Sequence, residues 1–349
     1  MSLKKIGIIC LCAVMLLTGC SAGSGNTSKT DDDTKTVKKV FAMDTYMTIT
    51  CYGEKSEEAA DAAVSEIERL DDLLSVGNPE SEISVINEKG SGSVSSDTMD
   101  MIKKAIEVWD ETDGAFDITI YPLMVEWGFT SGDFNVPDEK SINELLKYVD
   151  SGQIKVDDDN MTVSIGESQG IDLGGIAKGF TSDRLMEIFE EYGLTSASVS
   201  LGGNAQCYNT KPDGSSWKCA IVDPNSPDSS ESYLGIIELE DQAAITSGAY
   251  ERNFTDEETG KMYHHILDPS TGYPANSGLI SATVVSKSGI LADALSTSCY
   301  VMGLDKSIEF WENNREDFDL ILMTEDNTVY VTEGIKDHFS TEYSMVVVD

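Results

Sequence analysis

The feature that most constrains this chain is a glycine-rich turn, Ile171–Phe180, with the sequence IDLGGIAKGF. Its adjacent glycines, Gly174 and Gly175, let the backbone turn tightly and approach a ligand closely. Thr181–Phe189 follows with the spacing of an amphipathic helix, whose free N–H groups and positive dipole end would point into the turn. The pattern therefore predicts a phosphate-binding site, and a glycine-rich turn with only a structural role is the alternative.

Residues 1–19 have the pattern of an export signal. Lys4 and Lys5 precede an apolar run that is too short to span a bilayer, and the run ends in Leu-Thr-Gly followed by Cys20. This ending resembles a bacterial lipobox, which implies cleavage before Cys20 and lipidation of its thiol; an ordinary signal peptide is the alternative. Lipid on Cys20 would anchor the protein to the cell membrane, on the extracytoplasmic face. Residues 20–37 are expected to form a flexible tether, and residues 38–349 the folded domain.

Charge and cysteine content narrow the classes of partner and of site. The formal net charge is −38, from 24 basic and 62 acidic residues, which argues against nucleic acid as a partner. Cys51, Cys207, Cys219 and Cys299 would remain beside Cys20 after cleavage, with no spacing typical of a zinc site. A disulfide between Cys207 and Cys219 is conceivable in an exported protein, but buried free thiols are favoured in a chain of this size.

Apolar periodicity predicts a mixture of helices and strands. Strands are expected at residues 40–52, 154–156, 161–165, 196–201, 217–222, 234–239, 243–247, 279–285, 319–323 and 328–331. Helices are expected at residues 57–74, 99–109, 142–148, 181–189, 290–302 and 307–313. Because the two do not alternate strictly as βαβ units, an α+β fold is favoured over a doubly wound sheet.

Five segments together suggest a family. They occur in a fixed order along the chain: Asp172–Gly179, Ser200–Asn204, Thr246–Arg252, His265–Pro274 and Ala292–Thr297. In these segments the chain resembles the ApbE family, the FAD:protein FMN transferases. The resemblance implies a single large mixed α/β domain of the ApbE type, with the nucleotide site in a central cleft and FAD as substrate.

Asp293 and Thr297 are candidate metal ligands. They stand four residues apart on a predicted helix and therefore share one of its faces. Mg²⁺ commonly takes one or two such protein oxygens and completes its shell with water and phosphate oxygens. Without the family, such a pair is more often a polar helix face. The resemblance implies a Mg²⁺ site formed by Asp293, Thr297 and the backbone carbonyl of Gly175.

The resemblance also implies which residues contact the flavin nucleotide. Lys178 suits a phosphate as a point charge, and Asp172 suits a polar edge of the nucleotide or a cap on the turn.

Trp127 is interpreted as a residue of the hydrophobic core. Gly77 stands where the family often has an aromatic residue, so one flavin contact is lost or supplied elsewhere. The expected nucleotide contacts are Met43, Ala115, Phe116, Asp117, Asp172, Lys178, His265 and Leu267.

His265 is the candidate general base, because histidine alone has an unperturbed pKa near neutrality. Asp293 could take the proton instead. The expected function is Mg²⁺-dependent transfer of FMN from FAD to a Ser or Thr hydroxyl of an exported or membrane redox flavoprotein, with release of AMP. Two alternatives stay open: hydrolysis of FAD to FMN and AMP at the same site, and a lipoprotein that only binds a flavin or another solute.

Overall fold

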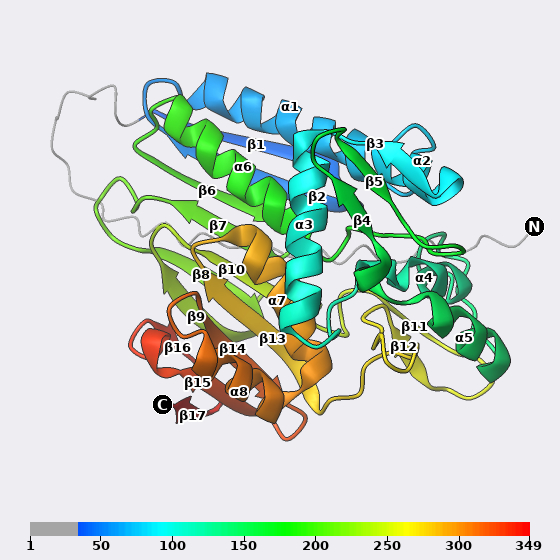
Figure 1. Cartoon of the computed structure of the whole chain (residues 1–349). Helices are drawn as coiled ribbons and strands as arrows, with labels where there is room; N and C mark the ends of the chain where they lie inside the picture. Colours follow the sequence, from blue (N-terminus) through cyan, green and yellow to red (C-terminus); the bar gives the residue numbers. More distant parts are fainter. Residues whose placement is uncertain (1–33) are drawn as a thin grey trace, which may run out of the picture.

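The computed structural model describes residues 34–349 as one mixed α/β fold around a large sheet (Figure 1). Neighbouring strands in this sheet are antiparallel except the last pair, β15 and β17, which is parallel. The α+β expectation is therefore confirmed. In spatial order the strands are β1 (Lys35–Ala42), β2 (Thr45–Tyr52), β6 (Ser196–Leu201), β7 (Asn204–Tyr208), β10 (Ala243–Ser247), β13 (Leu279–Ser286), β14 (Phe318–Thr324), β15 (Thr328–Thr332) and β17 (Ser344–Val348).

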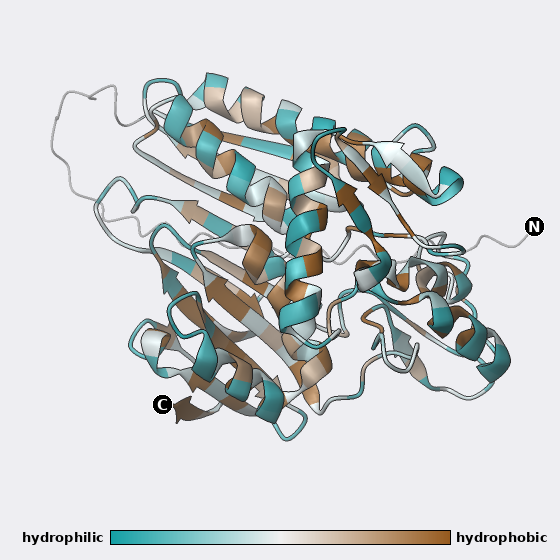
Figure 2. Ribbon diagram, viewed as in Figure 1, coloured by the Kyte–Doolittle hydropathy of each residue, from teal (hydrophilic) through white to brown (hydrophobic). Residues whose placement is uncertain are grey.

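Helices cover one face of this sheet, with their polar sides outward (Figure 2). In α1, buried Ala63, Ile67 and Leu70 recur at helical spacing, so one stripe packs inward while charged residues face solvent. The helices on this side are α1 (Ser56–Leu74), α3 (Ser96–Glu111), α6 (Ala177–Glu191), α7 (Gly289–Met302) and α8 (Leu304–Asn313), and α2 (Glu82–Lys89) packs beside α1.

A small second sheet packs on the other face. Side chains alternate along a strand, so Val284 of β13 lies in the helix-side core while Val285 lies in the core beneath the small sheet. Trp217 and Ile237 contribute to that second core from the small sheet itself. Its strands, in spatial order, are β16 (Phe339–Ser340), β9 (Tyr233–Leu239) and β8 (Trp217–Val222).

Several of the remaining short elements surround an aromatic cluster, whereas Val163 and Ile335 of the others pack in the helix-side core and in the core beneath the small sheet. Trp127 is fully buried in the aromatic cluster, and its indole Nε1 donates a hydrogen bond to the carbonyl of Gly272 at 2.9 Å. Its interpretation as a core residue is confirmed. The remaining elements are β3 (Ser91–Ser93), η2 (Ile118–Ile120), α4 (Tyr121–Glu126), α5 (Glu139–Leu145), η3 (Leu146–Tyr148), η4 (Ser151–Gln153), β4 (Lys155–Asp157), β5 (Thr162–Ser164), β11 (Asn253–Thr255), β12 (Met262–His264) and η5 (Glu333–Ile335).

The structure corrects two sequence boundaries near the N-terminus. The single strand expected at 40–52 is a hairpin, because Met43 and Asp44 adopt left-handed backbone angles (φ 48° and 60°) and reverse the chain. Strand β1 begins at Lys35, so residues 35–37 of the expected tether are part of the sheet. The export signal, Cys20 and residues 21–33 of the expected tether lie outside the described residues. No helix within residues 34–349 is long and apolar enough to cross a membrane.

The described cysteines are buried free thiols, as the sequence analysis favoured. Cys51, Cys207, Cys219 and Cys299 are all free and buried, so the conceivable Cys207–Cys219 disulfide is not formed.

Candidate functional site

The site is built on a close contact between helices α6 and α7. Gly179 lies against α7 so tightly that a Cβ there would overlap the carbonyl oxygen of Gly289 and lie 2.6 Å from the Cβ of Asp293. One turn further along α6, the carboxylate of Asp183 accepts hydrogen bonds from the backbone N–H groups of Gly289 (2.6 Å) and Ile290 (2.9 Å). This cap fixes the start of α7. The glycine-rich turn before α6 is thereby held beside the middle of α7.

The three residues expected to supply the metal ligands lie close together in this contact. Asp293 is only 5% exposed, and its Oδ2 accepts a hydrogen bond from the backbone N–H of Gly179 at 2.8 Å. A Cβ added at Gly175 would lie 3.8 Å from Oγ1 of Thr297, which in turn lies 3.3 Å from the Ser247 hydroxyl. None of the salt bridges formed in the described chain engages Asp293. The chain therefore offers a buried carboxylate, a hydroxyl and a carbonyl, all hard oxygens that suit Mg²⁺.

These protein ligands alone do not make a complete cage. Within residues 34–349, no group of three or more His, Cys, Asp or Glu side chains is placed to hold a metal ion. Mg²⁺ typically accepts such an open site, because waters and substrate phosphates complete its octahedron. The arrangement thus fits an ion that is held jointly by the protein and by a phosphate-bearing substrate.

Cationic and polar groups surround the glycine-rich turn. Lys178 belongs to the first turn of α6, which begins at Ala177 rather than at the expected Thr181. Asp172 shapes the turn, because its Oδ1 accepts a hydrogen bond from the backbone N–H of Gly174 at 2.8 Å. Burial raises the pKa of Asp172, and this N–H together with the charges of Arg252 and Lys178 opposes the rise. The turn therefore faces two cations, as an anion site requires.

Some expected nucleotide contacts border the turn. Met43 lies beside the first helical turn of α6, with Oγ1 of Thr181 3.9 Å from its sulfur. The buried ring of Phe116 would be 3.0 Å from a Cβ at Gly175, so the two residues are in close contact. Phe116 thus lies against Gly175, and Met43 lies beside the start of the helix that follows the turn.

Three other residues expected to contact the nucleotide make their observed contacts within the protein. The Asp117 carboxylate accepts hydrogen bonds from the backbone N–H of Thr119 (2.8 Å) and from the backbone (3.1 Å) and hydroxyl (2.7 Å) of Ser151. Leu267 packs in the aromatic cluster around Trp127. Ala115 donates its backbone N–H to Thr112 at the end of α3. For Ala115, Asp117 and Leu267, contact with a nucleotide stays a prediction.

His265 is half-buried and tied to Arg252. Its backbone N–H donates to the Arg252 carbonyl at 3.0 Å, and its ring Nδ1 lies 3.2 Å from the same oxygen. Since a carbonyl only accepts, we assign the ring hydrogen to Nδ1, which leaves the lone pair of Nε2 for a proton. Burial lowers the pKa of His265 to about 3, and the positive charge of Arg252 is the second-largest cause of this decrease. The ring is therefore neutral at pH 7 and able to accept a proton, although it is a weak base.

Sequence reasoning assigned no role to Glu251 and Asn204. Burial raises the pKa of Glu251 to about 7. The positive charge of Lys178 opposes this rise and the negative charge of Asp293 adds to it, so the Glu251 carboxylate lies within electrostatic reach of both side chains. Its Oε1 would be 3.6 Å from a Cβ at Gly203. Asn204 is 3% exposed, and its amide nitrogen has no hydrogen-bond partner. Both residues stood within the family segments, which were the only sequence signal for them.

The sequence model of the ApbE family matches residues 43–322. The chain belongs to the ApbE family. Among its relatives, the FAD:protein FMN transferase of Vibrio cholerae is 31% identical over 282 residues, which cover 79% of this chain and 81% of the relative. The FAD:protein FMN transferase of Haemophilus influenzae is 28% identical over 340 residues, which cover 94% and 96% of the two chains.

Solved structures share the fold. The ApbE protein of Thermotoga maritima superposes with a TM-score of 0.81 at 32% identity, covering 87% of this chain and 99% of that one. The flavin transferase ApbE of Vibrio cholerae superposes with a TM-score of 0.74 at 27% identity, covering 89% and 97%. The expected ApbE-type fold is therefore confirmed.

Proposed function

We propose that this chain transfers FMN from FAD to a Ser or Thr hydroxyl of an exported or membrane redox protein and releases AMP. The observation that carries the proposal is the junction of two motifs distant in sequence. The turn with Lys178 and the α7 pair Asp293 and Thr297 meet through the Gly179 contact. Relatives named FAD:protein FMN transferase align over most of the chain and support the same activity.

The reaction balances as a phosphoryl transfer. The acceptor oxygen forms a bond to the phosphorus on the FMN side of the pyrophosphate, and the bond from that phosphorus to the bridging oxygen breaks. The bridging oxygen leaves with AMP. The hydroxyl proton passes to a base, for which the free Nε2 lone pair of His265 is the first candidate and the Asp293 carboxylate the second. The product is a phosphodiester between FMN and the acceptor.

The charges of the site suit the pyrophosphate. Lys178 and Arg252 lie around the turn and would offset part of the negative charge. Mg²⁺ bound by Asp293, Thr297 and the Gly175 carbonyl would neutralise more of it and orient the phosphates.

We further propose that the protein acts on the extracytoplasmic face of the cell membrane, anchored by lipid on Cys20. The Leu-Thr-Gly-Cys sequence at the end of the apolar run supports this location. Cys20→Ala should release the protein from membranes or leave it unprocessed. Membrane retention with an unchanged mass would exclude the anchor.

Two other functions make different products. A hydrolase would use water in place of the acceptor hydroxyl and release free FMN with AMP. A flavin-binding lipoprotein would leave FAD intact, and it would give no reason for a buried carboxylate beside Thr297 without a cationic partner.

The deciding experiment uses membranes from cells that lack this gene, because they hold the acceptor unmodified. The purified protein is incubated with these membranes, FAD and Mg²⁺, and covalent flavin is read as fluorescence on denaturing gels. We expect at least one fluorescent protein, with AMP released in equal amount to bound FMN. Free FMN with AMP and no labelled protein would favour the hydrolase, and intact FAD would favour the binding protein.

A further inference from the structure

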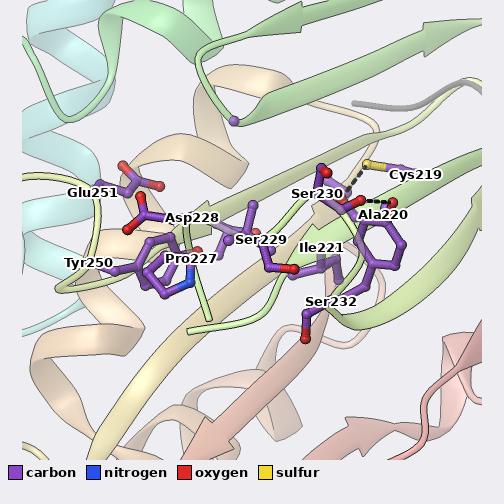
Figure 3. A pocket seen from close by; sticks show the side chains of 15 residues that line it. Cys219, Ala220, Ile221, Pro227, Asp228, Ser229, Ser230, Ser232, Tyr250 and Glu251 are labelled. Carbon is purple, nitrogen blue, oxygen red and sulfur yellow. Dashed lines mark hydrogen bonds between the residues drawn. The ribbon is translucent and has the colours of Figure 1, made fainter. Parts of the chain in front are cut away.

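A cavity of about 70 Å³ lies on the side of β10 that faces away from α7 (Figure 3). Alternation along β10 separates the two sides: Ser247 faces Thr297 of α7, whereas Ala244 and Thr246 line the cavity. Strand β8 and the loop between β8 and β9 form the other walls. Because roughly 10–15 Å³ of such a volume holds one water molecule, the cavity has room for several waters, and so for one small side chain.

The cavity adjoins the candidate active site. Glu251 and Gly203 line it, and Figure 3 shows Glu251 at one end of it and Cys219 at the other. Glu251 is also the carboxylate that lies in the field of Lys178 and Asp293. A molecule that fills the cavity therefore has one end beside the groups that would hold the pyrophosphate.

The charges of the cavity exclude a phosphate as its occupant. None of the fifteen residues that line it is Lys, Arg or His, whereas Asp228 and Glu251 are both acidic. A phosphate would meet like charge there without a compensating cation. The Ser230 hydroxyl suits an uncharged polar occupant instead, whereas the hydroxyls of Ser232 and Thr246 are already bonded to Asp223 (2.6 Å) and Thr283 (2.8 Å).

The shape of the cavity indicates an extended chain. Four consecutive residues of β8, 219–222, line it, although successive side chains of a strand point to opposite faces. The cavity therefore runs along the backbone edge of the strand. Strand β8 is the last strand of its three-stranded sheet, with no further neighbour among the described strands. Such an edge presents free N–H and C=O groups to which an extended peptide can add.

We infer that an extended segment of the acceptor polypeptide binds along the edge of β8. One small uncharged side chain of the segment fills the cavity, and the acceptor hydroxyl lies at the Glu251 end. The inference rests on the proposed transfer function and adds where its second substrate binds. A hydroxyl delivered from this side approaches the phosphates from the side opposite α7, which leaves the helix side to FAD.

The test fills the cavity from two walls. Ser230→Phe and Ala220→Phe place a ring in it from the loop and from β8, and Ser226→Phe adds the same ring to an exposed position of the same loop outside the cavity. Membranes from cells lacking the gene serve as the acceptor probe. FAD affinity is measured separately by fluorescence titration, which also reports an intact fold.

We expect both cavity variants to keep the FAD affinity of the parent and to lose about tenfold or more in the rate of protein flavinylation at low acceptor, while Ser226→Phe behaves like the parent. If Ser230→Phe and Ala220→Phe also flavinylate like the parent, the acceptor binds elsewhere. Weakened FAD binding in both would place part of the nucleotide in the cavity and overturn the inference. Absence of flavinylation by the parent itself would instead overturn the proposed function, and this inference with it.

Discussion

The two sides of strand β10 differ in the kind of recognition that they offer. The α7 side combines a glycine-rich turn, a helix N-terminus and the cations Lys178 and Arg252. The opposite side has a strand edge, serine hydroxyls and two carboxylates. Phosphate binding needs particular residues at fixed spacing, so it leaves a pattern in the sequence. Binding along a strand edge needs mainly exposed backbone, so it leaves almost none.

The largest effect that would separate the two sides is expected at Asp293. Asn at this position keeps the size but removes the charge, so the ion would be held weakly. We expect flavinylation to fall by roughly a hundredfold or more, with excess Mg²⁺ restoring part of it. Thr297→Val should be milder, because a neutral hydroxyl binds the ion less strongly than a carboxylate.

Ser298→Ala on the same helix is the matched control and should retain the parent rate. AMP release and protein-bound FMN are measured together, and both should decline in parallel for Asp293→Asn. An Asp293→Asn variant that is fully active with the metal chelated would show that the α7 side is not a metal site.

Lys178→Ala tests the cationic half of the comparison. Removal of one positive charge from the turn should weaken FAD binding by about tenfold and leave the midpoint of urea unfolding unchanged. Lys306→Ala, an exposed lysine on α8, serves as the control and should bind FAD like the parent. Equal FAD affinity in all three proteins would mean that the turn is only structural.

The pH dependence of stability should differ in sign between two residues of the site. The pKa of Glu251 is raised from 4.5 to about 7, so the native state binds the extra proton and stability falls as the pH rises through this window. The pKa of His265 is lowered from 6.5 to about 3, so the unfolded state binds the extra proton and the stability of the native state falls as the pH falls below 6.5. Glu251→Gln and His265→Gln should each remove one of these dependences, on the order of 1 kcal/mol after solvent screening.

Urea unfolding of the metal-free protein between pH 5 and pH 7.5 measures both dependences, with the parent as reference. Glu251→Gln should gain stability relative to the parent toward pH 7.5, and His265→Gln toward pH 5. Parallel curves for the two variants would refute the assigned shifts.

Asp228→Asn should have the smallest effect and sharpen the contrast in charge. This exposed carboxylate lines the cavity and not the turn, so FAD affinity should change by less than about twofold. Flavinylation at low acceptor should change by about twofold to threefold, and the change should shrink as salt is added. A large loss of FAD affinity would place the nucleotide on the cavity side.

The sequence predicted the regular elements and the motif-bearing side better than it predicted the contacts between them. Helices α1 and α7 begin within one residue of their expected starts, because their apolar spacing is regular. Strand β7 was missed, since Asn204 follows two glycines and reads as a loop. The start of α6 was placed four residues late, because Ala177–Phe180 includes a glycine that the α7 contact requires.

Residues of the candidate site could be predicted only where a local sequence motif contained them. Asp293, Thr297 and the glycine-rich turn were named from sequence, and the fold brings them together. The environments of Asp117 and Glu251 were not predictable. The Asp117 carboxylate is occupied by Ser151, and Glu251 owes its raised pKa to burial among groups distant in sequence.

The four buried thiols have a practical consequence for chemical labelling. Burial raises the pKa of Cys51, Cys219 and Cys299 to about 12 and that of Cys207 well above its usual value. Because the thiolate is the nucleophile, these side chains should resist alkylating reagents while the protein is folded. A cysteine introduced at exposed Ser230 would then be the one readily alkylated thiol within residues 34–349. A cross-linker attached there could capture the acceptor without replacement of any of the four buried cysteines.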